Sequence, residues 1–162
     1  MAQAIFGVAW AVFLGSGPVV ADDLPPKSLT REQLRQEADK AGKDPARLIQ
    51  LAQQAPEEET RRLLHQAMQL LTAGQADLSA RERERLARLF ASSLERAARS
   101  PDDVALIMGP KARPAVVRQV IFRMIREQWL YETPFRLAVT VDYRRGNDPR
   151  VSAVWALRPE RP

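Results

Sequence analysis

The stretch PFRLAVTVDYRRGNDPRVSAVWAL, from Pro134 to Leu157, decides the fold. It holds two runs in which bulky and small side chains alternate, separated by a polar segment that contains Arg, Gly, Asn and Asp. This alternation is typical of two antiparallel strands joined by a turn. Because no other part of the chain shows it, the sequence predicts one β-hairpin at the C-terminal end of a helical protein.

The register of this hairpin follows from the odd positions of its bulky side chains. A two-residue turn would pair odd with even positions and place one strand's bulky side chains on the opposite face. The sequence therefore predicts a loop of three or five residues, with Tyr143 opposite Val151 and Val139 opposite Trp155. The outer face would then hold small side chains, namely Ala138, Thr140, Val154 and Ala156.

Residues 114–131 are predicted to form a long central helix that begins at Pro114. At about 100° per residue, its apolar side chains cover more than half of the helix circumference, as in a helix that is buried on more than one side. Six of the seven aromatic residues after position 21 lie between residues 122 and 155. We therefore expect the bulky hairpin face, with Val139 and Trp155, to pack on Val120 and Met124 of this helix.

The helices before residue 110 are predicted from their capping residues. Thr30 with Gln33 and Ser79 with Glu82 are spaced as capping boxes, and Asp44 precedes a proline suited to a first helical turn. The fold class predicted is α+β and mainly α. It comprises about five helices and a C-terminal two-stranded antiparallel β-hairpin packed on the last long helix.

The domain prediction is a single domain over residues 30–162 after an extended lead-in at 22–29. Its helical part spans residues 30–100 and its helix–hairpin unit residues 101–162. An alternative is an array of helix pairs, because Gly42, Gly74 and Gly109 are 32 and 35 residues apart. The side-chain signatures of such repeats do not recur between the two intervals, which disfavours the array.

Residues 1–21 are predicted to be a signal peptide. The run from Ala4 to Leu14 is uncharged and apolar, a Gly–Ser–Gly–Pro break follows it, and small side chains precede a cleavage site after Ala21. The alternative is a membrane anchor through residues 2–21, but two glycines and a proline make it a poor membrane helix. We therefore expect a periplasmic or secreted protein, although no Lys or Arg precedes the apolar run.

Composition and charge restrict the chemistry of the protein. The chain contains no cysteine, which excludes disulfides, thiolate metal sites and a thiol nucleophile. Its net charge is +5, and the excess lies toward the C-terminus: residues 101–162 hold 11 basic and 7 acidic residues, against 14 and 13 in residues 22–100. The excess of positive charge therefore lies in the C-terminal unit.

No catalytic constellation is visible in the sequence. His65 is the single histidine and is predicted to point away from the apolar stripe of its helix. The neighbouring Asp102 and Asp103 are explained by a helix start. Neither a glycine-rich phosphate loop nor clustered metal ligands occur. We therefore predict no catalytic residues, no cofactor and no metal, and an enzyme of unknown class is the third choice of function.

The sharpest candidate site is basic. If positive side chains on the central helix and around the hairpin turn converge, they form, with one tyrosine, a contact site for an anion or a partner. These residues are Lys111, Arg113, Arg118, Arg126, Tyr143, Arg144, Arg145 and Arg150. The alternative is a scatter of solubilising charges.

The sequence thus predicts an exported, non-catalytic protein-interaction module of the cell envelope. Its partner would be recognised through the C-terminal unit, by a hairpin edge that pairs with a strand of a client protein or of a second copy. The alternative function is a basic surface that binds an anionic polymer or lipid. Nucleic acid is not an expected ligand of an exported protein.

Overall fold

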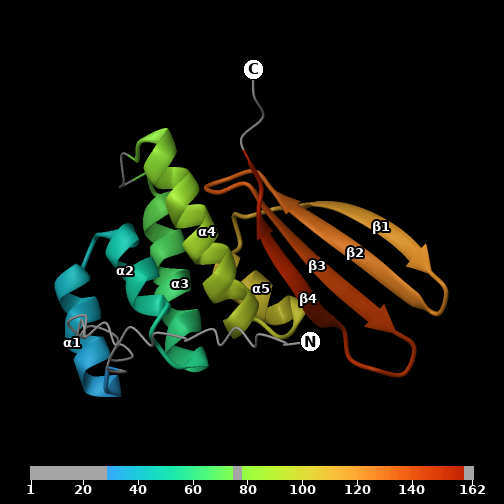
Figure 1. The fold of residues 1–162 in the computed structure, drawn as a ribbon, viewed down its shortest axis with the longest axis horizontal. Coiled ribbons are helices and arrows are strands. Elements are labelled where there is room, and N and C mark those ends of the chain that lie inside the picture. The colour runs from blue at the N-terminus through green and yellow to red at the C-terminus, as the bar shows by residue number, and fades with distance from the viewer. Residues whose placement is uncertain (1–28, 75–77, 159–162) are drawn as a thin grey trace, which may run out of the picture.

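The computed structural model describes residues 29–74 and 78–158. The predicted signal peptide and nearly all of the predicted lead-in lie outside these residues. The chain forms five helices followed by four strands (Figure 1). The helices are α1 (Arg31–Ala41), α2 (Pro45–Ala52), α3 (Glu57–Thr72), α4 (Ala80–Ala97) and α5 (Pro101–Met108). The strands are β1 (Ala115–Ile121), β2 (Met124–Tyr131), β3 (Leu137–Arg144) and β4 (Arg150–Ala156).

The predicted helix starts are confirmed. The Thr30 side chain accepts a hydrogen bond from the Gln33 N–H, and the Gln33 side chain accepts one from the Thr30 N–H. Ser79 and Glu82 make the same reciprocal pair at the start of α4. Asp44 accepts from two N–H groups in the first turn of α2. These bonds satisfy backbone donors that have no partner inside a helix.

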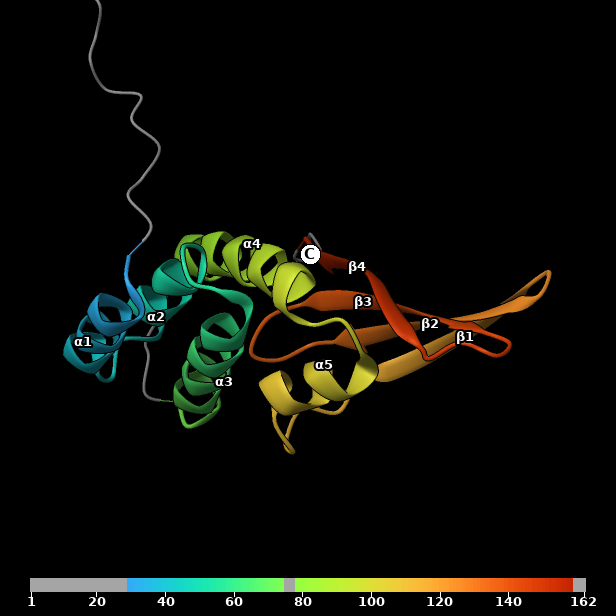
Figure 2. The same ribbon diagram turned by 90° about the horizontal axis from the view of Figure 1, so that it is seen from below.

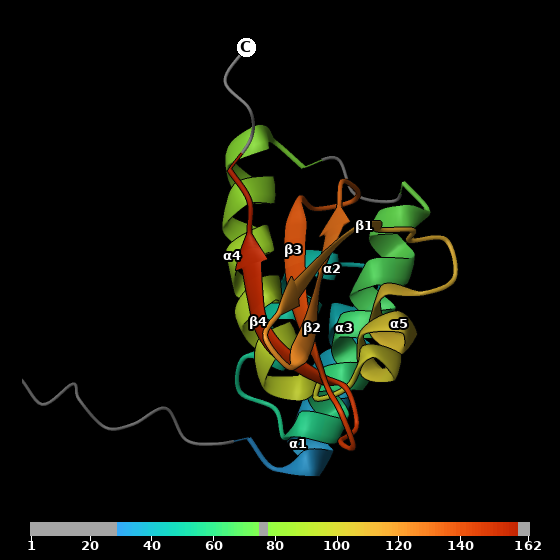
Figure 3. The same cartoon turned by 90° about the vertical axis from the view of Figure 1, so that its right-hand side faces the viewer.

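The four strands form one antiparallel sheet in the order β1-β2-β3-β4. The helices pack on one face of the sheet near its base, where β2 ends and β3 begins (Figures 1 and 2). Phe90 of α4 and Phe135 meet there with ring centroids 5.5 Å apart. Seen from the side of the hairpin loops, the strands lie in front of the helices (Figure 3). The two hairpin loops therefore project away from the helical layer.

The core joins the helices to the base of the sheet. Leu137, Val139 and Val141 of β3 are fully buried among apolar side chains of the helices, and Val154 of β4 joins them. No described residue of β1 belongs to this core. The sheet is thus anchored through β3, β4 and the end of β2.

The predicted central helix over 114–131 is wrong, and with it the predicted two-stranded hairpin. The structure forms β1 and β2 over this segment, joined by a two-residue turn at Phe122–Arg123. The β-branched residues of β1 suit a strand better than a helix. Their apolar arc is wide because both faces of β1 carry valine or isoleucine, and the pattern resembles that of a helix buried on several sides.

The predicted register of the C-terminal strands is also wrong. Val139 lies opposite Val154, and Trp155 lies opposite Ala138 on the other face. Val139 is fully buried, whereas the Trp155 side chain is 60% exposed. An irregularity between Thr140 and Val141 shifts the pairing by one residue. Beyond it, the bulky side chains of β3 and of β4 lie on opposite faces of the sheet.

Because of the same shift, the outer face of the sheet differs from the one predicted. Val154 and Ala156 lie with Val139 and Leu137 on the face toward the helices, and only Ala138 and Thr140 lie on the outer face. Near the loop, Val151 pairs with Val141 rather than with Tyr143. The helix expected to cover the bulky face is replaced by α3, α4 and α5, which come earlier in the chain.

Candidate functional site

The outer edge of β1 is the open edge of the sheet. All seven residues of β1 are exposed. The opposite edge, on β4, lies beside α4 (Figure 3), and the Val151 N–H donates to the Arg99 carbonyl at 3.0 Å. No described segment lies along β1 in the same way. The unpaired backbone groups of a sheet edge are a ready template for another strand.

Both faces of β1 are apolar. Val116 and Val120 lie opposite Trp129 and Ile125 of β2, on the face that the helices cover only near the base. The other face carries Val117 and Ile121. These four side chains are between 41% and 76% exposed. An edge strand that is apolar on two faces and uncovered on both is a candidate surface for strand pairing.

All charged residues in the segment that contains β1 are basic. Residues 111–123 include Lys111, Arg113, Arg118 and Arg123 and no acidic residue. Arg118 lies near the middle of β1, and its side chain stays 66% exposed although it contacts Glu127. The open edge therefore presents apolar side chains together with positive charge.

The Glu127 carboxylate holds the helix-facing side of β2 together. It accepts hydrogen bonds from Arg118 Nε at 2.9 Å, Trp129 Nε1 at 3.1 Å and Tyr143 Oη at 3.0 Å. These donors, led by Trp129 and Arg118, keep the pKa of Glu127 below its usual value although burial opposes them. The cluster joins three strands through one carboxylate.

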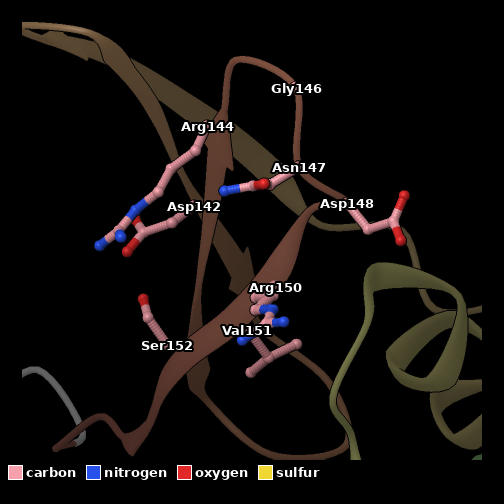
Figure 4. A pocket seen from close by; sticks show the side chains of 8 residues that line it. All are labelled: Asp142, Arg144, Gly146, Asn147, Asp148, Arg150, Val151 and Ser152. Carbon is pink, nitrogen blue, oxygen red and sulfur yellow. The ribbon is translucent and has the colours of Figure 1, made fainter.

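A second cluster lies on the outer face. The Asp142 carboxylate accepts from Arg126 Nε at 2.7 Å and from Arg126 Nη2 at 3.0 Å. This paired hydrogen bond lowers the pKa of Asp142, and the nearby charge of Arg144 adds to the effect. Arg150 lies opposite Asp142 in the register. Figure 4 shows the shallow hollow at this point: Arg144 runs back toward Asp142, and Asp148 points away.

The predicted basic site residues do not form one patch. Arg118, Arg126 and Tyr143 contact the carboxylates of Glu127 and Asp142. Three others gather around the β3–β4 loop. These are Arg144, Arg145 and Arg150. The remaining two, Lys111 and Arg113, precede β1 at the base of the sheet.

The loops at the far end of the sheet form a surface that the sequence did not reveal. Phe122, in the β1–β2 turn, is 91% exposed. A shallow hollow joins this turn to Arg144, Arg145 and Asn147 of the β3–β4 loop. We call residues 120–125 and 144–150 together the hairpin end. The run of β-branched residues before Phe122 was the available signal for it.

Among residues 29–74 and 78–158, no three His, Asp or Glu side chains gather as metal ligands. His65 is half-buried on α3, and its Nε2 lies 2.9 Å from Gln69 Nε2. No helix in this part of the chain is both long and apolar enough to cross a membrane.

Comparison with family models, with curated proteins and with solved structures finds no match to this chain. The interpretation of the two surfaces therefore rests on their own geometry and charge.

Proposed function

We propose that the protein is a non-catalytic interaction module of the cell envelope that binds an extended segment of another protein along β1. The bound segment would add a fifth strand to the sheet. Its side chains would alternate between apolar and acidic. Export of the protein is part of the proposal and rests on residues 1–21.

The observation that carries the proposal is the exposure of β1 on both faces and along its outer edge. Four aliphatic side chains of this strand remain in water, whereas the strand at the opposite edge of the sheet, β4, packs beside α4. Strand addition would supply backbone hydrogen bonds to the open edge and would cover part of the apolar surface.

The charge of β1 favours a different chain over a second copy. Lys111, Arg113, Arg118 and Arg123 would bring four positive charges from each copy to a shared edge, with no acidic residue in the segment to oppose them. Like charges placed across paired strands are destabilising. A segment with acidic side chains would instead complement these residues and associate faster at low salt.

Hairpin geometry shows which backbone groups are available. Ile121 and Met124 flank the two-residue turn and face each other in the register. Hydrogen-bonding direction alternates along a strand, so Val116, Arg118 and Val120 direct their N–H groups to the open edge. A proline at position 116 would therefore block an added strand and leave the β1–β2 ladder intact.

The test uses the purified full chain and two capped peptides of seven residues. One alternates Val with Glu, and its counterpart alternates Val with Lys. We expect the Glu peptide to bind and the Lys peptide not to bind. V116P, and K111E combined with R113E, should each weaken binding at least about tenfold. The matched control is R81E combined with R85E, which makes the same charge change on the exposed side of α4.

Equal binding of the two peptides, or no binding at about 1 mM peptide, would overturn the proposal. Light scattering on the peptide-free protein supplies a second arm. A dimer that V116P converts to a monomer would show that the edge is occupied by a second copy, which also overturns the proposal. Thermal unfolding of V116P verifies that the substitution leaves the sheet folded.

A further inference from the structure

We infer that the hairpin end docks on an anionic lipid surface, with the Phe122 ring entering the interface and arginines contacting the headgroups. This inference uses the loops of the sheet, whereas the proposed function uses the edge of β1. Each can therefore stand if the other fails.

The backbone at Phe122 is the first observation. Its φ is +53°, and it is the only described non-glycine residue with a positive φ. Glycine is the usual residue where a hairpin turn requires a positive φ, and a bulky aromatic side chain is rare there. Strained backbone of this kind clusters at functional sites.

The exposure of the Phe122 side chain is the second observation. Phe122 is 91% exposed, and the Arg123 guanidinium lies 5.4 Å from its ring centroid. The β1–β2 turn projects beyond the β3–β4 loop, away from the helices (Figures 1 and 2). Val120, Ile121 and Ile125 stand exposed beside it. The apex of the molecule is therefore apolar.

Positive charge surrounds this apex. The hairpin end contains four arginines and one aspartate, which gives a local charge of 4 − 1 = +3. The arginines are Arg123, Arg144, Arg145 and Arg150, and the aspartate is Asp148. Within the described part of the chain, none of these four arginines has a carboxylate within 4.0 Å. Four guanidinium groups are thus available to anions.

The turn with Phe122 projects beyond the arginines of the β3–β4 loop, and this arrangement favours a lipid surface as the ligand. A soluble anionic polymer would contact the arginines and leave the Phe122 ring in water. An anionic bilayer offers phosphate groups at the level of the arginines and an apolar layer beyond them. Aromatic and basic side chains are the residue types that interfacial binding favours, and each Arg near an anionic surface adds to the attraction.

The first experiment reads insertion at one position. F122W and the control L106W are prepared in the full chain and mixed with vesicles that carry brominated acyl chains. Leu106 lies on α5 and is 63% exposed, so both new indoles begin in water. With phosphatidylglycerol in the vesicles we expect strong extra quenching in F122W and none in L106W. This comparison holds even if residues 1–21 bind the vesicle.

The second experiment separates the apolar and charged contributions. F122G relieves the backbone and removes the ring, and it should weaken vesicle partitioning about 10- to 100-fold. R144Q combined with R145Q should weaken it by about 10- to 30-fold at low salt. R81Q combined with R85Q, on α4, is the charge-matched control and should have little effect.

Three results would overturn the inference. One is equal quenching of F122W and L106W, and another is equal quenching in vesicles of pure phosphatidylcholine. The third is binding to soluble polyglutamate as tight as binding to anionic vesicles and unaffected by F122G, which would identify a polymer site. The peptide assay for β1 reports on the proposed function separately.

Discussion

Replacing Glu127 by glutamine tests the organisation of the sheet most directly. Glu127 is 7% exposed, and its carboxylate accepts hydrogen bonds from Trp129, Tyr143 and Arg118. The amide of E127Q keeps the shape of the side chain, but it loses the negative charge. Its NH₂ group would also face one of the donors. The substitution should therefore destabilise the protein without creating a cavity.

The magnitude follows from the three contacts. The Arg118 side chain is 66% exposed, so its pair contributes at most about 1 kcal/mol. The bonds from Trp129 and Tyr143 lie in a part-buried site, and each contributes about 1 kcal/mol when the acceptor is charged. We expect E127Q to lower the free energy of unfolding by about 2–3 kcal/mol in total. R118Q should cost about 1 kcal/mol or less.

Chemical denaturation at pH 7 measures these differences, with E132Q as the matched control. Glu132 pairs with Arg136 at the protein surface and is 68% exposed, so E132Q should change the free energy by less than about 0.5 kcal/mol. Equal effects of E127Q and E132Q would refute the view that this cluster joins the strands. An R118Q effect larger than that of E127Q would refute the assigned roles of Trp129 and Tyr143.

The pH dependence of the free energy of unfolding is an independent test of the same cluster. Hydrogen bonds from Trp129 and Arg118 lower the pKa of Glu127 below its usual value of 4.5. A lowered pKa means that the stabilisation is fully present above pH 4.5 and is lost as the pH falls through the folded-state pKa. The parent protein should therefore lose more stability than E127Q between pH 5 and the acid limit of folding. Parallel loss in both proteins would contradict this assignment.

Three further predictions concern packing, the turn and a helix cap. V139A should cost about 2–3 kcal/mol and W155A only about 1 kcal/mol, measured by urea denaturation, because Val139 is fully buried and Trp155 is 60% exposed. If W155A cost more than V139A, Trp155 would be buried, as the register predicted from the sequence requires. F122G should raise the free energy of unfolding by about 1 kcal/mol, since glycine accepts the positive φ at no cost; a loss would show that the ring stabilises the fold. S79A should cost about 1 kcal/mol in thermal unfolding by removing the α4 cap, and an unchanged transition would contradict that role.

The helices were predictable because their signals are local. Thr30 and Gln33, or Ser79 and Glu82, need only be three residues apart to satisfy backbone donors at a helix start. The position of a helix start therefore depends little on which other elements pack nearby. The sequence therefore located these helix starts correctly, and capping residues preceded α2 and α5 as well.

β1 could not be identified by alternation because neither of its faces is buried. Alternation arises when one face of a strand meets the core and the other meets water. β1 meets water on both faces, so its paired valines and Val120–Ile121 are not constrained to alternate. The Phe122–Arg123 turn also lacks the Gly or Asn that marks most two-residue hairpins. The β-branched content was the one remaining signal.

The register of β3 and β4 failed for a different reason. Near the loop, the observed pairs Val141–Val151 and Asp142–Arg150 join positions of equal parity, as the bulky pattern required. The irregularity between Thr140 and Val141 then reverses the parity toward the base. A bulge adds one residue to one strand without a distinct composition, so the pattern could not reveal it.

The same anchoring explains both candidate surfaces. The helices stabilise the sheet only at its base, through β3, β4 and the end of β2, and leave β1 and the hairpin end in water. Apolar side chains at those positions lower solubility and contribute nothing to the core. The Asp142 and Glu127 clusters join the strands across the sheet beyond the part that the helices cover. An outer sheet cross-linked by ion pairs, with valine, isoleucine and phenylalanine exposed, suits both proposals, because a partner or a lipid surface would bind side chains that are already in place.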